Sequence, residues 1–201
     1  MKTKKFNTSQ LTILGLMSGI LFLMAYTPLG YLNVGPLAVT FNVIPVAICA
    51  VVLGPTGGAI AGAVFGLTSF MQAIGIGGVS ALGSALFQIN PFMTAVQCFG
   101  PRILDGICIG FIYRAVHKKA NTYVSCAVTG FFSAFLNTLF FMTALIVMFG
   151  NTELIRNLMG GHNIIVGCCL MVGVNAISEM VSSTIITAAV GTALSKAHLI
   201  P

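Results

Sequence analysis

Long apolar segments with almost no charged side chains constrain this sequence more than any other feature. Only 6% of its 201 residues are charged, 57% are hydrophobic, and the mean hydropathy is +1.03. A water-soluble globule of this size needs many more polar side chains to cover its surface. The net charge of +6 does not indicate nucleic-acid binding, because the basic residues lie at the ends of apolar segments, where membrane topology explains them. We therefore expect an integral membrane protein that lies in a lipid bilayer.

Six apolar segments are predicted to span the membrane as helices, which rise ~1.5 Å per residue across a hydrocarbon core of ~30 Å. They cover residues 11–26, 41–53, 59–74, 91–113, 122–149 and 164–194. The second segment is short, and the Gly and Pro residues at 54–58 predict a turn after it. The expected fold class is all-α, a six-transmembrane-helix bundle that forms a single domain over residues 1–201.

The connections between these segments carry little charge. Residues 28–40 contain two Gly, two Pro and one Asn, a composition that does not suit a helix and predicts an external loop. Residues 75–90 are rich in Gly and Ser and predict either a second external loop or a re-entrant segment covered by protein. Residues 151–163 predict another external loop, which contains Glu153 and Arg156.

The distribution of basic residues predicts the orientation of the chain. With six spans both termini lie on one side, and seven basic residues share that side: Lys2, Lys4, Lys5, Arg114, Lys118, Lys119 and Lys196. Cytoplasmic loops carry an excess of Lys and Arg, so both termini are expected in the cytoplasm as short tails. The first apolar segment lacks a small-residue cleavage pattern, so the N-terminus is expected to be retained.

Three ionisable residues lie inside predicted spans: Arg102, Asp105 and Glu179. Such residues are costly in a bilayer and normally face the bundle interior or a water-filled site. Arg102 and Asp105 are three residues apart, so they either neutralise one another along the helix or leave the guanidinium free for an anionic ligand group. Glu179 either pairs with Arg102 across the bundle, stays protonated, or accepts hydrogen bonds from a ligand.

Three amide side chains accompany these charges at similar depth: Gln97, Asn137 and Asn175. Asn175 lies one turn before Glu179 and shares its helix face. Buried amides either join neighbouring helices or contact a ligand as donor and acceptor. Together with Arg102 they predict a polar pocket beneath residues 28–40.

The sequence carries no motif that indicates an enzyme. It contains no HExxH, GxSxG or Walker A pattern, and no histidine is placed to serve a serine within the membrane. The six cysteines lie in apolar segments without metal-ligand spacing, so neither a metal nor a cofactor is expected. A stand-alone secondary transporter stays an alternative, although no inverted repeat is recognisable.

The order of motifs resembles the substrate-binding S components of energy-coupling factor vitamin transporters. The most specific part is the spaced pattern IPV…LGP..G…G..FG..S within residues 44–69. It is followed by NPF, PRILDG and YR, then by Asn137-Thr138, and finally by NAISE at 175–179. The resemblance covers nearly the whole chain and is closest to the subgroup with the pantothenate and riboflavin components. It implies a subunit that captures a vitamin from outside and associates with a membrane coupling protein and two cytoplasmic ATPase subunits.

The resemblance also implies roles for particular residues. Gly15 and Gly19 stand where the family carries a small-xxx-small motif at the interface with the coupling protein, although GxxxG is also typical of packing within one chain. The loop after the first helix gates the substrate in the family, which corresponds to residues 28–40 and brings Tyr31 and Asn33 toward the cargo.

The vitamin itself has two candidates from the sequence. Pantothenate carries a carboxylate, hydroxyls and an amide, which Arg102 and the three amides satisfy, whereas Asp105 and Glu179 add negative charge that disfavours an anion. Riboflavin calls for aromatic stacking, and the residues available for it are Tyr31, Phe41, Phe140 and Phe141. Similarity favours pantothenate, with riboflavin or another B vitamin as the alternative.

Overall fold

A computed structural model describes the backbone of residues 7–27, 30–33, 38–77, 80–158 and 164–200. Within these residues the chain forms eight α-helices and one short antiparallel hairpin. The elements in order are α1 (Thr8–Ala25), β1 (Tyr31–Asn33), β2 (Ala38–Thr40), α2 (Val43–Leu53), α3 (Pro55–Ala73), α4 (Ala81–Ile89), α5 (Pro91–His117), α6 (Thr122–Phe149), α7 (Glu153–Leu158) and α8 (Ile164–Lys196).

The predicted helical segments agree with these helices to within a few residues, except at the turn 54–58. Gly54 alone makes that turn, because its φ of 73° lies in the left-handed region that favours glycine. Pro55 then occupies the first helical position of α3, where its missing N–H costs nothing, and Gly57 and Gly58 are already helical. The prediction of a five-residue turn is therefore wrong, and α3 begins four residues earlier than expected.

Two predicted connections contain short helices. Helix α4 forms within residues 75–90, where the Ser80 side chain caps it by accepting a hydrogen bond from the backbone N–H of Gly83 at 3.1 Å. Helix α7 forms within residues 151–163 and places Ile155 in a small apolar cluster with side chains of α4 and α6. The described residues between 28 and 40 form no helix, and they pair as the β1–β2 hairpin.

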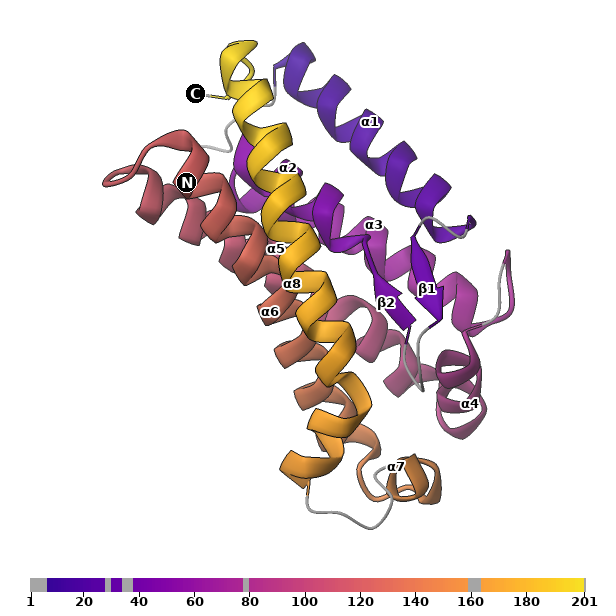
Figure 1. Ribbon diagram of the computed structural model, residues 1–201. Helices are drawn as coiled ribbons and strands as arrows, with labels where there is room; N and C mark the ends of the chain where they lie inside the picture. The colour runs from indigo at the N-terminus through magenta and orange to yellow at the C-terminus, as the bar shows by residue number, and fades with distance from the viewer. Residues whose placement is uncertain (1–6, 28–29, 34–37, 78–79, 159–163, 201) are drawn as a thin grey trace, which may run out of the picture.

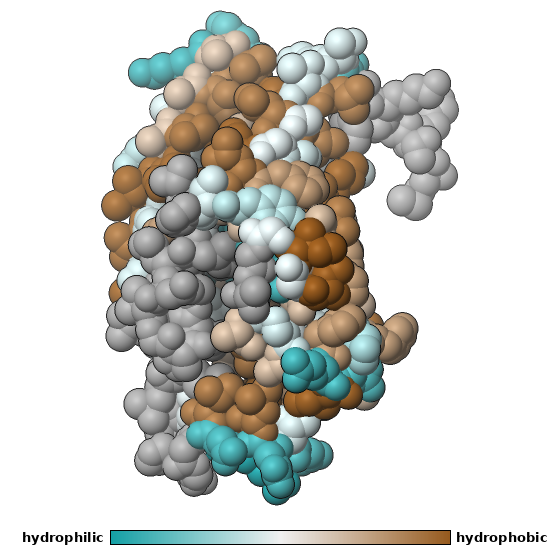
Figure 2. Space-filling model, turned by 90° about the vertical axis from the view of Figure 1, so that its right-hand side faces the viewer, coloured by the Kyte–Doolittle hydropathy of each residue, from teal (hydrophilic) through white to brown (hydrophobic). Residues whose placement is uncertain are grey.

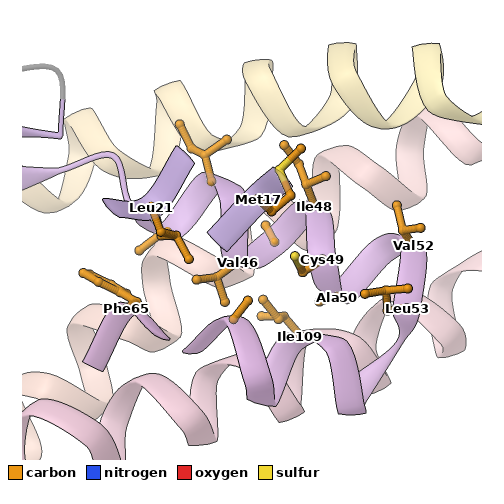
Figure 3. Close-up of a cluster of buried hydrophobic side chains, with 14 of the residues drawn as sticks. Met17, Leu21, Val46, Ile48, Cys49, Ala50, Val52, Leu53, Phe65 and Ile109 are labelled. Carbon is orange, nitrogen blue, oxygen red and sulfur yellow. The ribbon is translucent and has the colours of Figure 1, made fainter. Parts of the chain in front are cut away.

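Helix α2 lies at the centre of the molecule, and all eleven of its residues are buried. It contacts α1, α3, α5, α6 and α8. Figure 3 shows its side chains, among them Val46, Cys49 and Ala50, packed between Leu21, Phe65 and Ile109 of the surrounding helices. At ~1.5 Å per residue α2 is only about 16 Å long, so it occupies roughly half of a bilayer core.

Glycine allows the backbones of α3 and α5 to touch. A side chain at Gly58 would overlap the carbonyl of Gly106, one at Gly106 would overlap the carbonyl of Gly58, and one at Gly62 would overlap the carbonyl of Arg102. A side chain at Gly66 would likewise come too close to the carbonyl oxygen of Cys98 and the ring of Phe99. Gly58, Gly62 and Gly66, spaced four residues apart on one face of α3, therefore permit close contact with α5.

Four of the described helices are long and apolar enough to cross a membrane: Thr8–Ala25, Pro91–His117, Thr122–Phe149 and Asn175–Lys196. The space-filling view shows hydrophobic residues over much of the described surface, with hydrophilic residues gathered toward its two ends (Figure 2). Leu16, Phe92, Phe111 and Val147 are among the exposed apolar side chains. A surface of this kind suits contact with lipid, whereas the predicted number of six spans stays a prediction.

The ends of the long helices separate into two groups in space. Figure 1 places the start of α1, the connection from α5 to α6 and the end of α8 toward one end of the molecule, with α4 and α7 toward the other. Arg114, Lys118, Lys119 and Lys196 belong to the first end.

Candidate functional site

Arg102 lies on α5 at a place where the helix is missing one backbone hydrogen bond. Pro101 has no N–H, so the carbonyl of Gln97 loses its usual donor four residues along the helix. The Arg102 guanidinium replaces that donor, because its Nη1 donates to the carbonyl oxygens of Gln97 at 3.2 Å and Cys98 at 2.9 Å. The Pro-Arg pair thus repairs the helix and fixes the charged group beside it.

Two aromatic rings flank this guanidinium. Its central carbon lies 4.6 Å from the ring centroid of Phe65 on α3 and 5.5 Å from that of Phe141 on α6. Cation–π contacts of this kind hold a guanidinium in place without neutralising it. The Nε of Arg102 is buried and has no hydrogen-bond partner among the described residues. The group is therefore positioned by carbonyls and rings, and its Nε is a donor that no described residue uses.

Asp105 does not form the intrahelical ion pair with Arg102 that the sequence allowed. Its carboxyl is buried beside Ser133 on α6, and Oδ1 has no partner within the described part of the chain. The Ser133 hydroxyl donates its hydrogen bond to the carbonyl of Val43 at 3.3 Å. Asp105 thus contacts the junction of α5, α6 and α2, away from the groups that hold Arg102.

Glu179 on α8 is 5% exposed and binds the backbone of the hairpin. Its Oε1 accepts a hydrogen bond from the N–H of Thr40 at 2.6 Å. The positive charge of Arg102 also attracts this carboxyl. Of the three interpretations of Glu179 from the sequence, none anticipated a bond to the backbone of this chain.

The three amides lie around the same helices. The Nε2 of Gln97 donates to the carbonyl of Phe141 at 2.9 Å, and its buried Oε1 has no partner among the described residues. Asn137 is 7% exposed and lies one turn before Phe141 on α6, so it shares the face that meets Arg102. Asn175 is 5% exposed and lies one turn before Glu179 on α8. The structure thus joins Gln97 and Arg102 by a hydrogen bond, places Glu179 within the electrostatic influence of Arg102, and leaves the two asparagines adjacent by helix geometry.

The remaining predicted residues fall into two groups. Tyr31 and Asn33 lie in β1, but their side chains fall outside the described part of the structure. Gly15 and Gly19 on α1 have open space where a side chain would stand, so both face away from the rest of the chain. Among the described residues no three His, Cys, Asp or Glu side chains come together as metal ligands.

Sequence reasoning missed three participants in this region. Phe65 and the backbone of Thr40 carry no sequence signal, because only the folded chain brings them to Arg102 and Glu179. Asn42, just before α2, is fully buried, and neither of its side-chain amide atoms has a partner among the described residues. An amide within the otherwise apolar FNVIPV was the signal that could have identified it.

Comparisons with known proteins relate this chain to transport proteins. Residues 9–191 match the family described as ECF transporter, substrate-specific component. The pantothenate transporter PanT of Leuconostoc mesenteroides subsp. mesenteroides is 33% identical over 178 residues, which cover 85% of this chain and 81% of that protein. The pantothenic acid transporter PanT of Lactococcus lactis subsp. cremoris is 28% identical over 208 residues, which cover 97% and 98%.

Proposed function

Because this chain belongs to the family of ECF transporter substrate-specific components, we propose that it is the subunit that binds pantothenate for import. It is a multi-pass protein of the bacterial plasma membrane. Two relatives that match most of its length are named as pantothenate transporters, which favours this vitamin over riboflavin.

The observation that carries the proposal is the unused side of the Arg102 guanidinium. The hydrogen bonds it makes to described residues all come from Nη1, which leaves Nε and Nη2 for another acceptor. These two nitrogens lie on one edge of the planar group and present parallel N–H bonds that match a carboxylate. A carboxylate at this edge would satisfy a donor that is otherwise buried without a partner, which is costly.

The amides around Arg102 suit the remaining groups of the vitamin. Asn137 and Asn175 each offer a donor and an acceptor to its hydroxyls and its amide, and Gln97 offers its unpartnered Oε1. Tyr31 and Asn33 are expected to contribute from the hairpin side. Glu179 already accepts a hydrogen bond from the backbone N–H of Thr40.

The family also supports a proposal for topology and partners. Six spans with both termini in the cytoplasm agree with the basic residues that gather at one end of the molecule, the end of α5 and the end of α8. Impermeant thiol reagents should reach cysteines introduced beside Lys5 and Lys196 from the cytoplasmic side only. A membrane coupling protein and two ATPase subunits would supply the energy, with Gly15 and Gly19 at the coupling-protein contact.

The experiment that tests the site compares two ligands that differ at one group, which is a carboxylate in one and an uncharged hydroxyl in the other. Purified protein without nucleotide should bind pantothenate, and Arg102→Ala should weaken that binding about tenfold to a hundredfold, as expected for a lost charged hydrogen bond. The same substitution should weaken the binding of pantothenyl alcohol, which has a hydroxyl in place of the carboxylate, much less. Arg156→Ala, which removes an exposed arginine on α7, serves as the control and should change neither affinity.

Three outcomes would contradict the proposal. An equal loss for acid and alcohol, or no loss, would show that Arg102 only repairs α5. Tight binding of riboflavin without binding of pantothenate would reassign the substrate. Uptake of the vitamin by the lone protein in proteoliposomes, driven by an ion gradient, would indicate a stand-alone secondary transporter.

A further inference from the structure

The β1–β2 hairpin is too small to be stable alone. Each strand has three residues, and an isolated two-stranded hairpin is marginal at best. The hairpin lies beside α8 in Figure 1, and β2 is the strand that contacts this helix. Something outside the hairpin must therefore hold β2 in place.

The pairing of the two strands fixes the direction of one particular N–H. The backbone N–H of Phe41 donates to the carbonyl of Gly30 at 3.1 Å, so these two residues form a hydrogen-bonded pair. Hydrogen-bonded and non-hydrogen-bonded pairs alternate along an antiparallel ladder. The next pair, Tyr31 with Thr40, is therefore non-hydrogen-bonded, and the N–H of Thr40 points away from β1 toward the open edge of β2.

Glu179 accepts the hydrogen bond from this outward N–H. The 2.6 Å distance is short for a backbone donor, as is typical when the acceptor is a carboxylate. The bond joins residues 139 positions apart in the sequence, and Glu179 is buried, so little water competes with it. The same Thr40 accepts a hydrogen bond from the N–H of Asn42 at 3.3 Å through its hydroxyl, which links the clasped strand to the start of α2.

The bond also affects Arg102. Arg102 attracts the Glu179 carboxyl, yet the hydrogen bonds of its guanidinium to described residues go to backbone carbonyls of α5. The Thr40 N–H engages one oxygen of the Glu179 carboxyl, so that oxygen is not available to the guanidinium.

We propose that Glu179 is a positioning residue that clasps β2 onto α8, orders the hairpin in the empty protein and slows the release of bound vitamin. The part that concerns release rests on the proposed function, whereas the clasp itself does not. An alternative role for Glu179 as a direct vitamin ligand makes different predictions, because a ligand residue has no reason to order the hairpin before the vitamin binds.

The test is hydrogen exchange in the protein without vitamin, measured by mass spectrometry on peptides that cover residues 30–41. Glu179→Ala removes the acceptor and Thr40→Pro removes the donor without breaking a bond between the strands. Each single variant should raise the exchange rate in these peptides about tenfold. The double variant should exchange no faster than either single variant, because all three proteins lack the same hydrogen bond. Glu179→Gln keeps an oxygen acceptor and should have an intermediate effect.

Thr40→Val is the matched control, because it keeps the backbone N–H and loses only the hydroxyl. Thr40→Val should leave the exchange rate of the hairpin within about twofold of that of the unchanged protein. In a separate measurement, Glu179→Ala should raise the dissociation rate of radiolabelled pantothenate about tenfold. Unchanged exchange in both Glu179→Ala and Thr40→Pro would overturn the clasp. Weaker vitamin binding in Glu179→Ala with unchanged exchange in the empty protein would make Glu179 a vitamin ligand instead.

Discussion

At the scale of single residues, the polar side chains within the helices carry most of the information about function. The sequence identified Arg102, Asp105 and Glu179 because charges are rare in apolar segments. It could not identify their partners, since a backbone carbonyl freed by Pro101 or an N–H at the edge of β2 depends on the fold. The buried ionisable residues could thus be found from the sequence, whereas the groups that they contact required the structure.

Gln72 gives a prediction at this scale. Its Nε2 donates to the carbonyl of Ala25, in the last turn of α1, at 2.6 Å, and the side chain is 7% exposed. Gln72→Leu should lower the free energy of unfolding by about 1–3 kcal/mol, because it leaves a buried carbonyl without a donor. Thermal unfolding in detergent measures this loss. The exposed Gln88 supplies the control, and a Gln88→Leu variant that loses as much stability would contradict the assignment.

At the scale of elements, the apolar segments predicted the long helices to within a few residues. Proline at the first position of α5 and asparagine before α6 stabilise the starts of these two helices. The exceptions were segments in which tertiary contacts override composition. Residues 54–58 read as a turn although most of them are helical, and α4 and α7 form within predicted connections because their apolar side chains meet α6.

The contact between α3 and α5 gives the prediction at this scale. Gly106→Ala should destabilise the protein by about 1–3 kcal/mol, because the new methyl group would overlap the Gly58 carbonyl and force the two helices apart. Gly100→Ala lies on the same helix with no atom near its new methyl group. It should be neutral or slightly stabilising, since alanine favours a helix over glycine. Equal melting temperatures for the two variants would show that α3 and α5 can move apart at this contact with little loss of stability.

At the scale of the whole molecule, the apolar surface and the segregation of basic residues were predictable from the sequence. The roles of individual helices were not, because these segments are apolar on all sides and periodicity cannot separate core from lipid. Helix α2 shows this most clearly. It was predicted to be a short span, and in the structure it is enclosed by five other helices.

The open face of α1 gives a prediction for the assembled transporter. Because Gly15 and Gly19 face away from this chain, Gly19→Leu should leave pantothenate binding by the isolated protein unchanged. It should abolish vitamin uptake in cells that contain the coupling protein and the ATPases, because a large side chain prevents close helix contact. Leu23, already large and exposed on α1, provides a Leu23→Phe control. Normal uptake by Gly19→Leu would place the partner contact elsewhere.

The enclosed α2 has a consequence for biosynthesis. Its eleven residues are too short to anchor in a bilayer core of ~30 Å as an independent segment. Gly54 turns the chain directly into α3, so we expect the two helices to enter the bilayer as one hairpin during synthesis. We then expect the core of the protein to form only after α5, α6 and α8 have been made, since these later helices supply much of the wall around α2.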